Sequence, residues 1–135
     1  IAGEADSGRS KGPVEGLSVA PKFIDVNLPA GAVFREDVPA GHTAFAYLDR
    51  GKVEFGTGDD RQSVEGPALV VFGEGDFIRA RGGSKGGRFL LAAARPIGEP
   101  IARYGPFVMN TREEIEQTLD ELRSGKFIRE EATDA

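Results

Sequence analysis

The chain has 135 residues and a formal net charge of −5, with 39% hydrophobic and 29% charged residues. This composition is typical of a single globular domain, and the acidic balance with scattered Lys and Arg argues against direct binding of nucleic acid. The absence of cysteine excludes disulfides, thiolate metal sites and cysteine nucleophiles. No apolar run approaches the roughly 18 residues of a membrane span and no export leader is visible, so we expect a soluble, cytoplasmic protein.

The first sixteen residues, IAGEADSGRSKGPVEG, are rich in glycine and charge and carry few apolar side chains. They predict a connecting segment rather than a folded element. The chain opens without Met, and its initial Ile-Ala is expected to end a strand that begins upstream. Residues 1–16 are therefore interpreted as a linker, or a continuing strand, from a missing preceding domain.

Short apolar runs separated by glycine- and proline-bearing turns follow as far as residue 94. They are KFIDVNL, AVFREDV, HTAFAYL, KVEFG, ALVVF, DFIRAR and RFLLAAA, at 22–28, 32–38, 42–48, 52–56, 68–72, 76–81 and 88–94. No helix-length periodic segment interrupts them. Runs of this length and spacing predict an all-β sandwich or barrel over 17–110.

The runs differ in the faces that they are expected to bury. The runs at 43–48 and 88–94 are apolar on both parities, as in central strands covered on both faces. The run at 76–81 alternates, which indicates partial exposure or an edge strand, where Arg79 and Arg81 could hold a carboxylate or keep the edge soluble. The glycine-rich stretches at 72–77 and 81–87 do not lie between a strand and a helix, so hairpin turns are favoured over phosphate binding.

One helix is expected, over 111–125, followed by a disordered tail over 126–135. Thr111 and Glu114 have the spacing of a capping box, and Gly125 is placed to end the helix in a left-handed conformation. An apolar stripe of Ile115, Leu119 and Leu122 predicts that the helix docks on a barrel, because an isolated helix of this length is marginal in water.

Catalytic and metal-binding readings of the polar residues are weak. His42 is the sole histidine. An acid–base pair with Tyr47 is disfavoured, because two residues five positions apart on an unbroken strand point to opposite faces of the sheet. The helix acids also lack the histidine partner of a carboxylate di-iron helix, so a solvated face is favoured. These acids are Glu113, Glu114, Glu116, Asp120 and Glu121.

The segment RYGPFV at 103–108 places two aromatic residues on either side of a Gly-Pro turn. It can be interpreted as a corner that fixes the helix on the barrel or as an interface, where aromatic residues are enriched. The candidate interdomain or interface residues are Tyr104, Gly105, Pro106, Phe107, Ile115, Leu119 and Leu122.

Residues 99–127, EPIARYGPFVMNTREEIEQTLDELRSGKF, resemble the end of pirin and pirin-like proteins. In that family a Glu-Pro, a Tyr-Gly-Pro-Phe-Val-Met-Asn-Thr run, Glu-Glu-Ile and Gly-Lys-Phe recur in this order. IAGEADSGRSKGPV is similar to the segment that links the two halves of those proteins, PAGHTAFAYLDRGKVEFG to the central hairpin of the second half, and VVFGEGDFIRARGG to its later strands. The resemblance implies a C-terminal cupin-type β-barrel, a jelly-roll-like sandwich, with one C-terminal α-helix.

The resemblance also implies where a metal is expected. Pirins are bicupins, and their iron or similar divalent ion lies in the N-terminal cupin on three His and one Glu. When the first cupin metal motif is aligned on Gly51, Ala44 falls at the Glu position and His42 falls between ligand positions. The stretch that matches the second motif contains no His. We therefore expect no metal and no catalytic residue in this chain, whose partner would be the N-terminal cupin half.

Two functions of the parent protein remain open on this resemblance. One is a quercetin 2,3-dioxygenase-type reaction, in which dioxygen opens a metal-bound flavonol. The other is a redox-responsive transcription cofactor that acts through protein partners. A third reading, a free-standing barrel with metal-free activity around His42 and Tyr47, is the weakest. By itself the chain is expected to be a non-catalytic domain.

Overall fold

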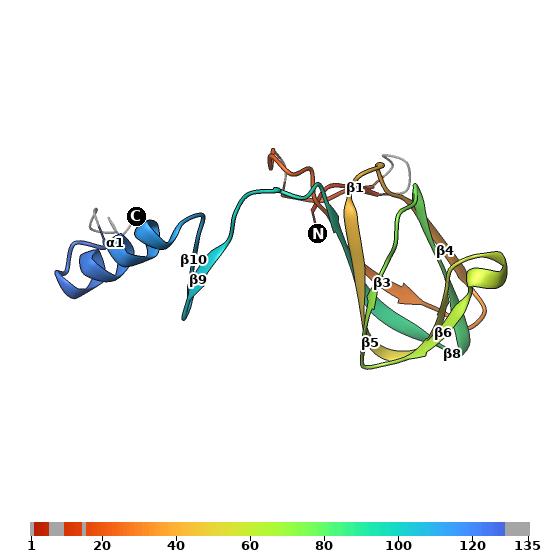
Figure 1. The fold of residues 1–135 in the computed structure, drawn as a ribbon. Coiled ribbons are helices and arrows are strands. Elements are labelled where there is room, and N and C mark those ends of the chain that lie inside the picture. The colour runs from red at the N-terminus through yellow and green to blue at the C-terminus, as the bar shows by residue number, and fades with distance from the viewer. Residues whose placement is uncertain (1, 6–9, 15, 129–135) are drawn as a thin grey trace. The chain divides into compact units, whose positions relative to one another are not determined.

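The computed structural model describes residues 2–5, 10–14 and 16–128, and the contacts divide the chain into two compact units, 1–96 and 97–135. The first unit is a β-barrel, and the second is a hairpin followed by a helix (Figure 1). The tail predicted over 126–135 lies outside the described residues from 129 onward, as do residues 1, 6–9 and 15 of the predicted linker. No helix in the described part is long and apolar enough to cross a membrane.

Two long antiparallel strands, β5 (Thr43–Phe55) and β8 (Phe77–Ala94), form the centre of the barrel. The first half of β5 and the second half of β8 lie in one sheet, with β3 (Lys22–Leu28) beyond β8 and β7 (Ala68–Val71) beyond β5. The other halves of both strands continue the same six-stranded sheet around the barrel, where β4 (Val33–Asp37) and β6 (Gln62–Glu65) complete it. We call these two parts of the continuous sheet the first sheet and the second sheet. The prediction of an all-β architecture with one α-helix is confirmed for the described residues.

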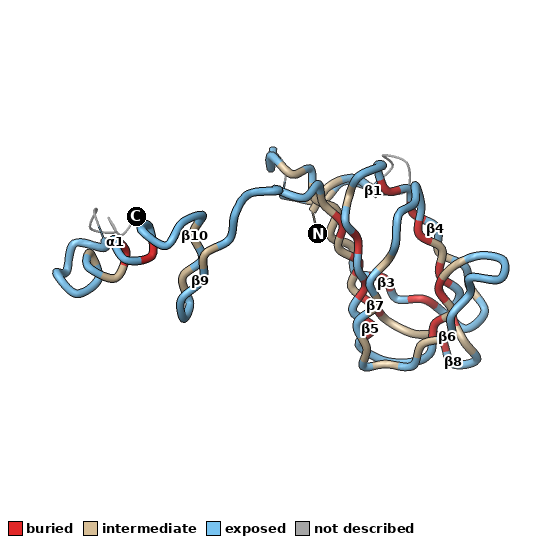
Figure 2. The backbone as a smooth tube through the Cα atoms, in the orientation of Figure 1, coloured by how far each residue is buried: buried red, intermediate tan, exposed pale blue. Residues whose placement is uncertain are grey.

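The barrel interior is filled by alternate residues of these strands (Figure 2). Leu48, Val53, Phe89 and Leu91 are the largest side chains that are completely enclosed. The Phe89 ring packs edge-to-face against Phe55 at a centroid distance of 5.3 Å. It packs in the same way against Phe34 at 5.7 Å, and Phe72 contacts Phe55 at 5.7 Å. Each such side chain stabilises the fold by about 1.5–3 kcal/mol on full burial, so these rings are a main source of barrel stability.

Glycine allows β5 and β8 to pass from one sheet to the other. The prediction of a hairpin turn at 81–87 is wrong, because these residues lie inside β8. A Cβ atom at Gly82 would lie 2.2 Å from the Pro29 carbonyl oxygen, and one at Gly87 would lie 2.6 Å from a methyl carbon of Val53. The glycines therefore permit a close backbone crossing rather than a chain reversal.

Three further strand predictions also need correction. The runs at 42–48 and 52–56 form the single strand β5, with irregular pairing between Leu48 and Arg50 and between Gly51 and Val53. The stretch at 72–77 is not a hairpin turn, because it connects β7 to β8, which pair with β5 rather than with each other. The run at 76–81 is partly exposed, as one of the two predicted alternatives stated, but the other alternative is wrong: it is not an edge strand, because β4 pairs with it on one side and the end of β5 on the other. A short 3-10 helix, η1 (Gly58–Asp60), precedes β6.

The N-terminal segment folds back on the barrel. It contains a small hairpin, β1 (Glu4–Ala5) and β2 (Ser10–Lys11). Ala2 forms an antiparallel bridge with Phe23 of β3 and a parallel bridge with Val14. The described part of the linker predicted over 1–16 thus contacts the first sheet at its β3 edge.

The second unit comprises β9 (Ala102–Tyr104), β10 (Phe107–Met109) and α1 (Arg112–Arg123). The predicted capping box is confirmed: the Thr111 hydroxyl accepts from the Glu114 amide at 3.2 Å, and the Glu114 carboxylate accepts from the Thr111 amide at 2.9 Å. Gly125 follows the helix with a φ of +72°, as predicted. The hairpin contacts α1, so the contact boundary after residue 96 differs from the sequence-based boundary at 110.

Candidate functional site

The outer face of the first sheet is apolar and open to solvent in the described chain. Phe45 and Tyr47 of β5 are 42% and 44% exposed, although their neighbours in the strand are buried in the barrel. Phe45 pairs with Val71 and Tyr47 pairs with Leu69, which are 69% and 63% exposed. We call these four residues the outer apolar face.

This face extends across β8. Ala92 lies beside Phe45 and Leu90 lies beside Tyr47, and both are half-buried. Phe23 of β3 continues the first of these rows. The expectation that the runs at 43–48 and 88–94 are covered on both faces is therefore wrong within the described residues. The inner face is buried by the barrel core, whereas no described element of the barrel unit closes the outer one.

The predicted aromatic corner forms the turn of the β9–β10 hairpin. Tyr104 pairs with Phe107 across the two-residue loop Gly105–Pro106, in which Gly105 has the positive φ of 55° that such a loop requires. Tyr104 is exposed, whereas Phe107 packs edge-to-face against Phe127 at 6.0 Å. The two aromatic residues thus occupy one hairpin but have different surroundings.

The apolar stripe of α1 is graded from buried to exposed. Ile115 is buried, Leu119 is half-buried and Leu122 is 51% exposed. Ile115 and Leu119 line a groove of about 480 Å³ beside Tyr104. Ile115 therefore packs within its own unit, whereas Tyr104 and Leu122 remain accessible. Assignment of these residues to an interdomain surface stays a prediction.

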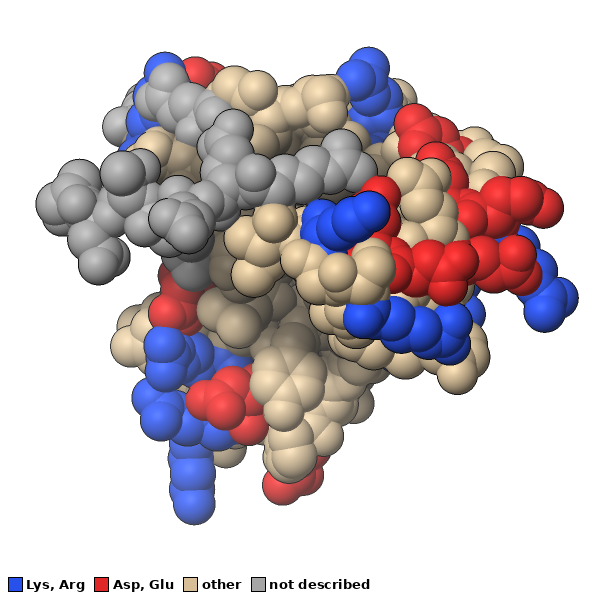
Figure 3. All heavy atoms as spheres, turned by 90° about the vertical axis from the view of Figure 1, so that its left-hand side faces the viewer, with Lys and Arg blue, Asp and Glu red and all other residues tan. Residues whose placement is uncertain are grey.

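The helix acids act as caps and local ion pairs. Besides the capping contact of Glu114, Arg112 pairs with Glu116 at 3.4 Å and Arg123 with Asp120 at 3.1 Å. Acidic side chains gather in one part of the face drawn in Figure 3. Among the described residues, no group of three or more His, Cys, Asp or Glu is arranged to hold a metal ion. The described residues therefore do not supply the three His and one Glu that a cupin metal requires.

His42 and Tyr47 do not form a catalytic pair. His42 precedes β5 and shares its parity with the buried residues of the strand, whereas Tyr47 belongs to the outer apolar face. The His42 Nδ1 atom is buried without a hydrogen-bond partner. His42 lines a cavity of about 600 Å³ with Glu74 and Asp76, but these three are not arranged as metal ligands.

Two ion pairs connect strands of the barrel. The Lys22 ammonium lies 2.5 Å from the buried Glu36 carboxylate and donates to the Asp37 carbonyl at 2.8 Å, which joins β3 to β4. Arg88 donates twice to Asp25, at 3.0 and 2.7 Å. This hydrogen bonding lowers the pKa of Asp25 below its usual 3.8, against the opposing effect of desolvation. Both pairs tie β3 to its neighbours and neither forms a reactive centre.

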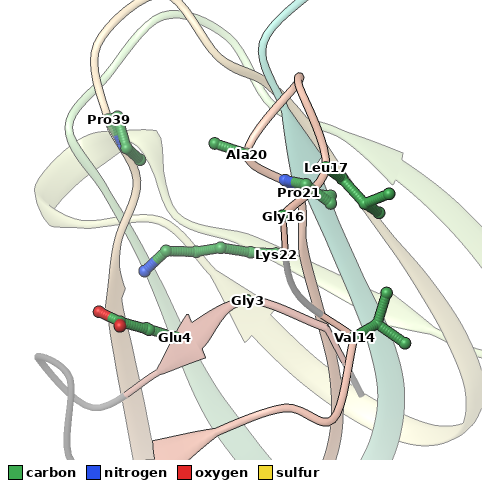
Figure 4. Close-up of a pocket in the computed structure, with 9 residues that line it drawn as sticks. All are labelled: Gly3, Glu4, Val14, Gly16, Leu17, Ala20, Pro21, Lys22 and Pro39. Carbon is green, nitrogen blue, oxygen red and sulfur yellow. The ribbon is translucent and has the colours of Figure 1, made fainter.

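A pocket of about 330 Å³ lies where the N-terminal segment meets β3. Figure 4 shows Lys22 crossing the middle of this pocket, with Glu4 below it and Pro39 beyond its end. Gly3 and Val14 contribute from the N-terminal side, and Ala20 lies on the opposite side. The pocket marks the contact between the folded-back segment and the first sheet.

Arg79 and Arg81 lie between β4 and β5. Arg81 pairs with Val33 on one side and Glu54 on the other, and it lines a shallow cavity of about 460 Å³ together with Lys52. Glu54 places a carboxylate in the same cavity, which offsets the positive charge available to an anion. Of all the surfaces described, the outer apolar face has the strongest physical reason to bind a partner.

Comparison with known proteins identifies the family to which the fold belongs. The model of the pirin C-terminal cupin domain matches residues 23–128. A pirin-like protein of Caulobacter vibrioides is 39% identical over 127 residues, which cover 94% of this chain and 44% of that protein. Human pirin is 38% identical over 105 residues, which cover 77% of this chain and 36% of human pirin.

A crystal structure described as quercetin 2,3-dioxygenase from Acinetobacter baumannii superposes with a TM-score of 0.82 at 31% identity. The match covers 94% of this chain and 42% of that one. The chain thus spans about two fifths of the length of these relatives, and the predicted cupin-type barrel is confirmed. The chain belongs to the pirin C-terminal cupin domain family.

Proposed function

We propose that this chain is the non-catalytic C-terminal cupin domain of a two-domain pirin-like protein, and that its outer apolar face packs against the N-terminal half. The observation that carries the proposal is the joint exposure of Phe45, Tyr47, Leu69 and Val71 on one sheet face. Contiguous apolar patches on soluble proteins mark interaction surfaces. Regular strand pairing holds these side chains in a fixed array, which suits a stable contact.

We further propose that the parent protein is a metal-dependent enzyme of the quercetin 2,3-dioxygenase type. The likeness to the Acinetobacter baumannii structure supports this reaction class. Iron or another divalent metal in the N-terminal half would hold the flavonol that dioxygen opens. The residues of this chain would act by packing: they cover and orient the half that carries the metal.

The packing proposal is tested by a charge on the outer apolar face of the two-domain parent. Leu69→Asp should lower the free energy of unfolding by about 2 kcal/mol or more, because a carboxylate would be buried without a partner. Val33→Asp is the matched control, since Val33 is also more than half exposed but belongs to β4 in the second sheet. Urea unfolding measures both variants, and equal losses would contradict the proposal.

The metal proposal is tested by dividing the parent at the linker and measuring iron in each half. Iron should stay with the N-terminal half, and this chain should hold less than a stoichiometric amount. One tightly held ion in this chain would contradict the assignment. A parent that binds iron but does not consume dioxygen with quercetin would instead favour the regulatory function, in which the two-domain protein acts through protein partners.

A further inference from the structure

The first sheet has an open edge at β3. All seven residues of β3, Lys22–Leu28, pair with β8 on one side. On the other side, within the described residues, only Phe23 is bonded, through two backbone hydrogen bonds with Ala2 at 3.1 and 3.0 Å. The N–H and C=O groups of alternate residues in a strand point to the same side. The backbone groups of Asp25 and Asn27 therefore also point to the open edge.

The Ala2 bridge fixes a direction for the polypeptide that precedes it. Ala2 and Phe23 are antiparallel partners, so each earlier residue of a continuing strand would pair with a later residue of β3. Other residues of the N-terminal segment also hold Ala2 in place. Ala2 forms a parallel bridge with Val14, and the Gly12 amide donates to the Gly3 carbonyl at 2.9 Å. A chain that enters through Ala2 is thus directed along the unpaired part of β3.

We propose that the segment of the parent protein immediately before Ala2 adds an antiparallel strand to β3 and hydrogen-bonds to Asp25 and Asn27. This inference rests on the proposed two-domain arrangement, in which a segment from the N-terminal half reaches Ala2. The added strand would close the exposed edge, which natural sheets seldom leave open. It would also widen the outer apolar face by one strand on its β3 side.

The occupant is the parent's own segment rather than a second copy of the barrel. Ala2 already occupies the edge at Phe23, so a second β3 could pair only with the remaining residues of the strand. The connected segment enters in register through the existing bridge and needs no separate association step.

Gly3 provides the means to disturb this strand specifically. Gly3 directly follows the bridging residue Ala2 and has a φ of +74°. A Cβ atom at Gly3 would lie 2.3 Å from the Pro21 carbonyl oxygen. Gly16 has the same φ of +74° but nothing within 4 Å of the added atom. Gly3→Ala should displace Ala2 from β3, whereas Gly16→Ala introduces a similar backbone strain without that collision.

Amide hydrogen exchange of the intact two-domain parent tests the proposal. The Asp25 and Asn27 amides should exchange at least about a hundredfold more slowly than exposed amides. Gly3→Ala should accelerate both, while Gly16→Ala should not. The Ile24 and Val26 amides, which face β8, should stay slow in all three proteins.

Exchange of Asp25 and Asn27 at the rate of exposed amides in the unmodified parent would overturn the inference, even if Gly3→Ala does not fold. Protection that disappears on dilution would also overturn it, because it would assign the edge to a second copy. Either result is distinguishable from failure of the proposed packing, which the Leu69→Asp and Val33→Asp comparison reports separately.

Discussion

At the residue scale, the barrel depends on glycines placed where two backbones touch. Gly51 has a φ of +85°, and a Cβ atom there would lie 2.3 Å from the Gly86 carbonyl oxygen. Gly41 has a similar φ of +80° but no atom within 4 Å. The two positions therefore separate the cost of a left-handed backbone from the cost of a collision.

We expect Gly41→Ala to lower the free energy of unfolding by about 1–3 kcal/mol, the cost of a non-glycine residue in this region. Gly51→Ala should cost at least about 2 kcal/mol more, because overpacking against a backbone oxygen adds to that strain. Urea unfolding of both variants measures the difference. Equal losses of unfolding free energy in the two variants would show that β5 and β8 can move apart at Gly51 and Gly86 without loss of stability.

The Asp25–Arg88 pair predicts a specific response to acid. Hydrogen bonding by Arg88 lowers the folded-state pKa of Asp25 below 3.8, so the stability it contributes is present above that pH. The contribution is lost as the pH falls through the folded-state value. Asp25→Asn should therefore make stability less dependent on pH below about 4.

The exposed Asp59 of η1 provides the control for this measurement. Asp59→Asn removes one carboxylate outside the Asp25–Arg88 pair and so controls for the change in net charge alone. Chemical unfolding at a series of pH values compares the three proteins. A curve for Asp25→Asn that coincides with the unmodified one would mean that the pair does not form in solution.

At the element scale, local signals in the sequence predicted the helix well. Thr111, Glu114 and Gly125 have short-range roles, and each has the predicted geometry. The lengths of β5 and β8 were not predictable in the same way. A glycine run has the same local appearance in a turn and in a strand that crosses close to another backbone, and only the distant Pro29 and Val53 distinguish the two for β8.

The helix cap gives a test at this scale. Thr111→Ala should destabilise α1 by about 1 kcal/mol, whereas Thr111→Ser should retain the cap because its hydroxyl can accept the Glu114 amide. Amide exchange across 112–118 should accelerate only in the alanine variant.

In the intact parent, we also expect protected amides across 114–122, and unprotected ones there would contradict docking of the helix.

At the scale of the whole molecule, the sequence predicted the fold class and family but not the outer apolar face. The relevant signal, apolar residues on both parities of β5 and β8, was visible. It predicted coverage on both sides, whereas no described element of the barrel unit covers the outer face. The aromatic corner was a more prominent sequence feature, yet only part of it is accessible. Tyr104 and Leu122 are exposed, whereas Ile115 is used within its own unit.

The pairing of β5 with β8 also determines when the barrel can form. Phe55 pairs with Ala80 at the inner end of this ladder, and Thr43 pairs with Ala94 at the outer end. The ladder can therefore close progressively from the shorter loop to the longer one. Pairing between strands so distant in sequence is slow, because loop closure precedes the stabilising contacts. During synthesis, β6 and β7 can pair with β5 before β8 emerges, whereas β3 and β4 have β8 as their partner strand and lack it until β8 has left the ribosome. The barrel is therefore completed late.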